Sequence, residues 1–172
     1  MTRPTGTHRT RPEGEALVIT RSFDADADDI WGLVSRPEGT ARWIGPYEGD
    51  PATGSVRLTM TAEGEDVPAS VVTIERCEPP RLLEVRTADE VGGWRLILEV
   101  GPADGSGRTE VALSHLLTDP VGIENIGPGW EFYLDRLGAA IAGADPQAVR
   151  WDDYYPALRD HYLAIESTFP RG

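Results

Sequence analysis

Apolar positions along the chain follow two different periods, which predict a sheet followed by helices. Between residues 47 and 117, apolar side chains recur at every second position in short successive runs, as in strands with one buried face. Turn residues such as Pro79-Pro80 and residues 104–107 separate these runs, so we predict an antiparallel meander. Val, Ile and Thr between residues 16 and 23 predict one further strand before it.

The period changes to that of an α-helix after Pro120. Four apolar residues then follow the spacing i, i+4, i+7 and i+11, which places one stripe of a long helix against the sheet. They are Trp130, Leu134, Leu137 and Ile141. Two short helices are predicted earlier, the first capped by Asp26 and ended by Pro37, the second over residues 38–43. Helical spacing of Trp151, Tyr155, Leu158, Tyr162 and Ile165 predicts an extra C-terminal helix.

These elements together predict an α+β fold in which a curved antiparallel sheet wraps around a long helix. We expect residues 1–14 to be a disordered tail, because Thr, Pro, Gly and Arg dominate them. Residues 15–143 form the single domain. Residues 144–172 form a helical extension that packs on this domain or on a second copy of the chain, which would give a homodimer.

Charge and hydropathy exclude several classes of partner. The formal net charge is −13, and such a surface repels phosphate backbones and anionic lipids, so we expect neither nucleic-acid nor membrane binding. No apolar run approaches the ~20 residues of a membrane-spanning helix. Residues 1–15 hold no hydrophobic stretch that could act as a secretory signal, so we expect a cytoplasmic protein.

Candidate chemistry is sparse. All basic residues are Arg, so a lysine Schiff base and a P-loop lysine are excluded, and Cys77 is the only cysteine. Ser114 and His115 are adjacent in a predicted strand, so their side chains point to opposite faces and cannot form a dyad. No histidines have the spacing of a metal site. We therefore expect no metal, no cofactor and no catalytic motif.

Alternation identifies the residues that face the long helix and could line a cavity. They are Met60, Leu83, Val85, Trp94, Leu96, Leu98, Val111, Leu113, His115, Trp130 and Leu134. His115 is the titratable side chain among them, and the sequence leaves two interpretations open. It is either a hydrogen-bonded core residue or the anchor for an oxygen of a ligand.

The order of elements and several short stretches resemble the helix-grip fold of the START-related SRPBCC superfamily. In detail they resemble its branch called activator of heat-shock protein 90 ATPase homologues. The stretches are residues 19–25 with Ile30-Trp31 after them, 42–44, 74–82, 113–115 and 129–137. Together they lie between residues 16 and 141, which is most of the chain.

The resemblance implies a cavity between the sheet and the long helix. Relatives include lipid carriers, plant hormone receptors, polyketide aromatase/cyclases and co-chaperones, and the superfamily has no universal catalytic motif to carry over. We therefore expect binding of a small apolar or aromatic molecule. One alternative is a cyclase/aromatase-type enzyme that uses His115 as acid or base. The other is a protein-interaction module of the co-chaperone kind.

Overall fold

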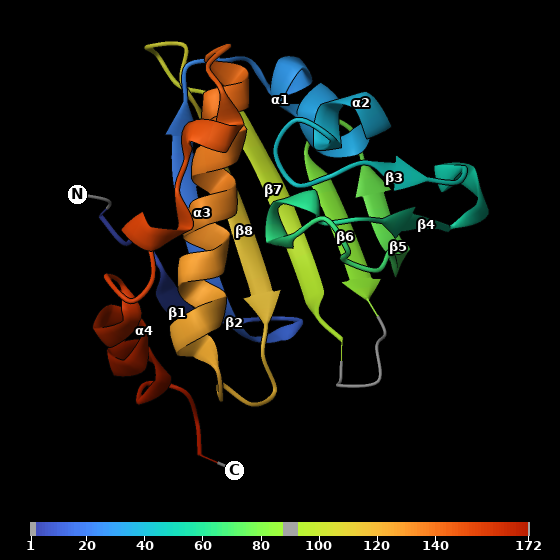
Figure 1. Cartoon of the computed structure of the whole chain (residues 1–172). Coiled ribbons are helices and arrows are strands. Elements are labelled where there is room, and N and C mark those ends of the chain that lie inside the picture. Colours follow the sequence, from blue (N-terminus) through green and yellow to red (C-terminus); the bar gives the residue numbers. More distant parts are fainter. Residues whose placement is uncertain (1–2, 88–92, 172) are drawn as a thin grey trace.

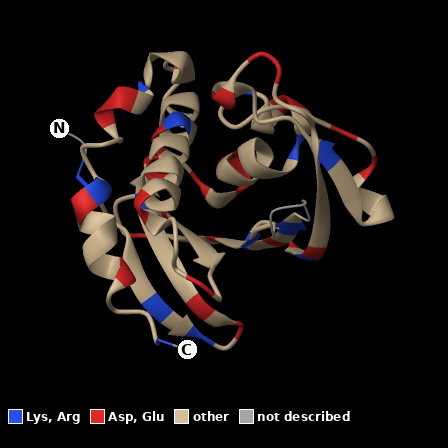
Figure 2. Ribbon diagram, turned by 60° about the horizontal axis from the view of Figure 1, so that its bottom comes forward, with Lys and Arg blue, Asp and Glu red and all other residues tan. Residues whose placement is uncertain are grey.

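The computed structural model describes residues 3–87 and 93–171, and an eight-stranded antiparallel sheet forms its centre (Figure 1). The strands lie in the order β1-β2-β8-β7-β6-β5-β4-β3. Their bounds are β1 Thr7–Arg11, β2 Gly14–Phe23, β3 Tyr47–Glu48, β4 Ser55–Leu58, β5 Ser70–Glu78, β6 Leu82–Thr87, β7 Arg95–Ala103 and β8 Thr109–Leu116. Viewed toward its lower end, the sheet bends around the helices (Figure 2).

Helices cover one face of this sheet. Their bounds are α1 Ala27–Ser35, α2 Pro37–Thr40, α3 Ile123–Ile141 and α4 Arg159–Glu166, with short 3-10 turns at Pro51–Thr53 (η1), Thr61–Glu63 (η2), Pro146–Ala148 (η3) and Trp151–Asp153 (η4). The predicted helix-grip architecture is therefore confirmed, with six strands, β3 to β8, forming the meander.

Helix α3 packs on the sheet through the predicted stripe. Leu134 and Leu137 are fully buried, Trp130 is buried, and Ile141 at the end of the helix is half-buried. Helix α1 begins where Asp26 accepts a hydrogen bond from the Asp29 amide at 2.8 Å, as predicted for its N-cap.

The N-terminal segment differs from the prediction, because the expected disordered tail contains strand β1. Residues 7–11 pair with β2 in the register Thr7↔Val18 to Arg11↔Gly14. The tip of this hairpin lies on the outer face of the sheet, where Arg11 Nη1 donates to Glu99 Oε2 at 2.8 Å and to Ser114 Oγ at 3.2 Å. The short polar strand has no apolar alternation of its own, so only its pairing partner reveals it.

The C-terminal segment contains a shorter helix than predicted. Residues 151–158 form η4 and turns, and only α4 is helical, because Pro156 lacks an amide hydrogen and disfavours helix at the residue before it. As a result Tyr154, which the predicted stripe left out, is buried, while Tyr155 is half-buried and Trp151 is 41% exposed. The second short helix is also shorter than predicted and ends at Thr40.

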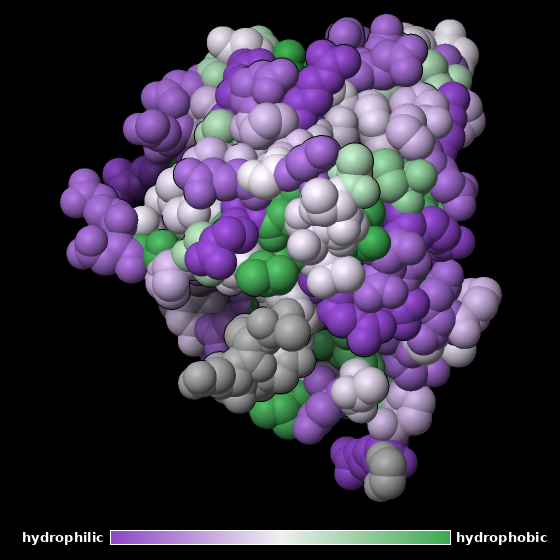
Figure 3. Space-filling model, turned by 90° about the vertical axis from the view of Figure 1, so that its right-hand side faces the viewer, coloured by the Kyte–Doolittle hydropathy of each residue, from purple (hydrophilic) through white to green (hydrophobic). Residues whose placement is uncertain are grey.

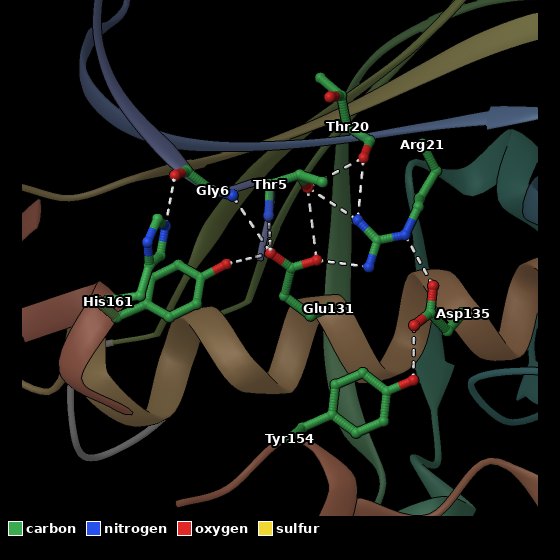
Figure 4. Close-up of polar contacts among 9 residues, drawn as sticks. Thr5, Gly6, Thr20, Arg21, Glu131, Asp135, Tyr154 and His161 are labelled. Carbon is green, nitrogen blue, oxygen red and sulfur yellow. Dashed lines mark hydrogen bonds and ion pairs between the residues drawn. The ribbon is translucent and has the colours of Figure 1, made fainter. Parts of the chain in front are cut away.

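A buried polar network ties the two terminal segments to α3 (Figure 4). Glu131 is fully buried and accepts hydrogen bonds from the Thr5 amide at 2.6 Å, the Gly6 amide at 3.2 Å and the Tyr162 hydroxyl. Its second oxygen lies 2.5 Å from Arg21 Nη2. Burial, and then the negative charge of Glu131, raise the pKa of Tyr162, so its hydroxyl stays protonated and donates.

The surface of the molecule is mostly polar. Acidic residues outnumber arginines along the ribbon (Figure 2), in keeping with the net charge of −13. On the side that carries β3 and β4, apolar side chains emerge between hydrophilic ones in the middle of the face (Figure 3). Within residues 3–87 and 93–171, no helix is long and apolar enough to cross a membrane.

Candidate functional site

An apolar cavity lies between the inner face of the sheet and helices α1 and α3. Its volume is about 160 Å³, and apolar atoms make up nearly all of its wall. The residues that line it are Val34, Ser35, Thr40, Trp43, Ile44, Tyr47, Pro51, Val56, Leu58, Val72, Ile74, Cys77, Leu83, Val85, Trp94, Leu96, Leu98, Leu113, Trp130 and Leu134. We call this space the inner cavity.

Eight of the eleven predicted lining residues line the inner cavity, and strand register brings five of them there. Leu83 pairs with Leu98, and Leu98 pairs with Leu113, so one row of side chains crosses β6, β7 and β8 on the same face. Val85 pairs with Leu96 in the next row. Trp94 precedes β7, while Trp130 and Leu134 come from α3 on the opposite wall.

Three predicted residues lie elsewhere. Val111 is fully buried in the core and lines neither the inner cavity nor the groove described below. Met60 and His115 line that groove instead. Met60 does so because the alternating run of β4 ends at Leu58, and Met60 lies just before η2.

A β-bulge in β5 places Cys77 in the cavity wall. Simple alternation from Ile74 would assign this residue to the outer face of the sheet and put Arg76 on the inner face. The register of β5 shifts between Ile74 and Arg76, so that Cys77 pairs with Leu83 and shares its face. No residue type in this stretch signals the bulge, so the sequence could not have predicted it.

Most of the other residues that the prediction missed carry a recognisable signal. Val56, Leu58 and Val72 lie at alternating apolar positions of their strands, and this alternation marks them as facing the core. Trp43 and Ile44 form an apolar pair after the second short helix. Trp43 Nε1 donates to the Leu33 carbonyl at 2.8 Å, which holds the indole between α1 and the sheet.

An open groove of about 690 Å³ adjoins the inner cavity. Its walls come from α3 and the segment 60–70, and Trp151 of the C-terminal segment also lines it. The residues that line it are Met60, Ala62, Glu63, Val67, Pro68, Ser70, Trp94, His115, Asn125, Ile126, Gly129, Trp130, Phe132, Tyr133 and Trp151. Trp94 and Trp130 line both spaces, with their rings edge to face and their centroids 5.9 Å apart.

His115 is held in one tautomer at the end of this groove. Trp130 Nε1 donates a hydrogen bond to His115 Nδ1 at 2.9 Å, and an indole nitrogen can only donate. Nδ1 is therefore the acceptor, and in the neutral ring the proton is on Nε2. Burial lowers the pKa of His115 to about 4, so the ring is neutral at pH 7.

A second polar pair closes one side of the groove. The Tyr133 hydroxyl donates to Glu63 Oε1 at 3.2 Å, which links α3 to η2. Burial, and then the charge of Glu63, raise the pKa of Tyr133. Tyr133 therefore acts as a hydrogen-bond donor at neutral pH.

The described part of the chain contains no arrangement typical of a metal site. It contains no group of three or more His, Cys, Asp or Glu side chains placed to hold a metal ion. Ser114 lies on the opposite face of β8 from His115 and accepts a hydrogen bond from Arg11. The Glu131 network is saturated by its own partners and lies outside both the inner cavity and the groove.

Solved structures share this fold over almost the whole chain. The crystal structure of CalU16 from Micromonospora echinospora is 28% identical, covers 96% of this chain and 98% of its own, and has a TM-score of 0.70. Its solution structure is 25% identical, covers 98% and 96%, and has a TM-score of 0.73. EF2215 from Enterococcus faecalis shares the fold with a TM-score of 0.70 at 15% identity, over 96% of this chain and 92% of its own. None of the curated proteins matches the chain.

The model of one protein family matches residues 24–142, a span that includes α1, the meander and all of α3. All the residues that line the inner cavity lie within this span. The chain therefore belongs to the family described as Activator of Hsp90 ATPase homolog 1-like protein, in the SRPBCC superfamily.

Proposed function

We propose that this protein binds a small apolar or aromatic molecule in the inner cavity. The observation that carries the proposal is the cavity itself, about 160 Å³ of space with an almost wholly apolar wall that is partly open to solvent beside the exposed residues Pro51 and Cys77. Proteins usually fill their cores to crystal-like density, so an unfilled apolar space forfeits contacts that a ligand can restore. The SRPBCC fold is one of ligand-binding and cyclase-like proteins, which agrees with this role.

The expected affinity is modest. Burial of apolar ligand surface contributes about 25 cal/mol per Å². The cavity offers almost no polar group to add to this term. We expect a dissociation constant in the micromolar range or weaker. This corresponds to a binding free energy on the order of −8 kcal/mol or less in magnitude.

Toluene tests the proposal directly, because one ring fits a cavity of this size. Saturable shifts of the methyl NMR signals of Leu98 and Leu134 are expected on titration. Val72→Phe should abolish them, because Val72 lines the cavity and the larger ring fills it. Val71→Phe is the matched control, since Val71 is 45% exposed on the other face of the same strand. Linear, unsaturable shifts in the unmodified chain would refute binding in the cavity.

A cyclase-type role for His115 has weaker support. A general base needs a free lone pair directed at its substrate. The Nδ1 lone pair of His115 is engaged by Trp130, and Nε2 carries the proton. This geometry suits a hydrogen-bond donor. If toluene fails to bind, the protein-interaction alternative takes the place of ligand binding.

A further inference from the structure

The inner cavity is too small for a ligand of more than one ring. An engineered cavity of about 150 Å³ in another protein holds benzene, and the inner cavity measures about 160 Å³. The groove, at about 690 Å³, shares Trp94 and Trp130 with the inner cavity as lining residues. A larger ligand seated in the inner cavity would therefore extend past these two indoles into the groove.

A buried polar atom points into the groove without a protein partner. His115 is only 7% exposed, and its Nδ1 is occupied by Trp130. Nε2 of His115 has no hydrogen-bond partner among the described residues. In the same part of the chain, every side-chain nitrogen or oxygen that is fully buried does have a partner. Nε2 must therefore reach open space, and the groove is the space that His115 lines. The Nε2–H group can therefore donate a hydrogen bond to an acceptor atom of a ligand in the groove.

The charge of the groove selects against anions. Among the described residues, Glu63 lines the groove and no Arg does, and the sequence has no Lys. The formal charge of −13 on the whole chain adds to the negative potential. A carboxylate or phosphate in the groove would lie near Glu63, and the nearby Arg136 guanidinium already donates to the carbonyls of Trp43 and Pro146.

We infer that the ligand is an uncharged molecule of two parts. A benzene-sized apolar end occupies the inner cavity, and the remainder lies in the groove with an oxygen that accepts a hydrogen bond from His115 Nε2. Ketones, quinones and aryl ethers have this chemistry. The inference rests on the proposed function, and it adds the second compartment and the acceptor group.

Three probes of similar size test the inference. Benzophenone has two rings and a ketone oxygen, diphenylmethane lacks the oxygen, and 4-benzoylbenzoate adds a negative charge. We expect benzophenone to bind about 3- to 10-fold more tightly than diphenylmethane, which is the contribution of one net hydrogen bond. 4-Benzoylbenzoate should bind more weakly than benzophenone. The Nε1–H signal of Trp130 in ¹H–¹⁵N NMR spectra reports the binding, because this group contacts His115.

His115→Leu should remove the preference for benzophenone and leave the affinity for diphenylmethane within about twofold, because it deletes one hydrogen bond. His161→Leu is the matched control, since His161 lies on α4 and lines neither space, and this variant should keep the preference. An equal affinity of the unmodified chain for both neutral probes would overturn the inference, and so would a preference that survives in His115→Leu.

The tautomer gives a measurement that needs no variant. Long-range ¹H–¹⁵N spectra of the unmodified chain should show Nε2 of His115 as the protonated nitrogen, and a protonated Nδ1 would overturn the inference. Toluene separates the two proposals. If toluene binds but benzophenone shows no preference over diphenylmethane, the inner cavity is a binding site and the groove is not. If toluene does not bind, the proposed function itself fails.

Discussion

At the scale of single residues, His115 combines features of a core residue with features of a ligand anchor. The alternation of β8 places it inward among apolar neighbours, and from the sequence it could be a core residue or a ligand anchor. In the structure one nitrogen is bonded within the core, to Trp130, and the other faces the groove. Two distinct ring nitrogens allow both roles at once.

The stability of the protein should depend on pH through His115. Burial lowers its pKa from the ordinary value of 6.5 to about 4 in the folded chain, so the unfolded chain binds more protons between these values. Stability is therefore complete above about pH 6.5 and falls as the pH drops toward 4. Between pH 7 and 4.5 the loss should be about 2–3 kcal/mol, at 1.36 kcal/mol for each unit of pKa difference.

Urea denaturation at pH 7 and pH 4.5 measures this effect. Carboxylates also titrate in this range, so the measurement compares the unmodified chain with His115→Leu. The variant should lose less stability on acidification, by the amount that His115 contributes. Equal losses in the two proteins would show that burial does not lower the pKa of His115.

At the scale of elements, the helix periodicity of α3 predicts the face toward the sheet but not the approach of α4. The stripe from Trp130 to Ile141 follows from spacing alone. On another side of α3, the ring of Tyr162 fits between Gly6 and Gly127, where a Cβ at either glycine would overlap it. Gly127 thus allows two helices to approach closely, a reason for a helical glycine that periodicity cannot show.

Two glycine substitutions, two residues apart on α3, should have opposite effects. Gly127→Ala should destabilise the protein, because the new methyl group overlaps the buried ring of Tyr162. We expect the free energy of unfolding to fall by about 1–3 kcal/mol, which is the typical cost of overpacking a core. Gly129→Ala should be neutral or stabilising by up to about 1 kcal/mol, because alanine favours helix and no described atom lies within 4 Å of its Cβ.

Thermal or urea unfolding of both variants tests the packing of α4 on α3. A Gly127→Ala protein as stable as the Gly129→Ala protein would mean that Tyr162 does not occupy this position.

At the scale of the whole molecule, the two terminal segments close over the side of α3 that lies beside β2, where Glu131 and Asp135 also pair with Arg21. Thr5 and Gly6 reach Glu131 from the N-terminal side, and Tyr162 reaches it from the C-terminal side. Tyr154 donates to Asp135 Oδ2 at 2.6 Å one turn further along (Figure 4). The C-terminal segment also supplies Trp151 to the groove, although it lies beyond the residues that match the family model.

Truncation after Ala144 should therefore have two effects. The denaturation midpoint should fall, because Glu131 loses a hydrogen bond and apolar residues of α3 become exposed to water. Benzophenone should bind more weakly, since the groove loses Trp151, whereas toluene binding in the inner cavity should remain wherever the truncated chain is folded. A chain that ends at Pro170 is the control and should match the unmodified protein. Unchanged stability after truncation at Ala144 would contradict the role assigned to this segment.

The sequence by itself determined the sheet, the long helix and most of the inner cavity wall. These features depend on local periods of two and 3.6 residues, and side chains such as Leu98 and Leu134 face the core because of their position in their own element. Only the tertiary structure decided the rest. The bulge that turns Cys77 inward, the strand that residues 7–11 form and the division of space at Trp94 and Trp130 arise from contacts between residues distant in sequence. A local pattern carries no information about such partners, because their energy exists only once the chain has folded.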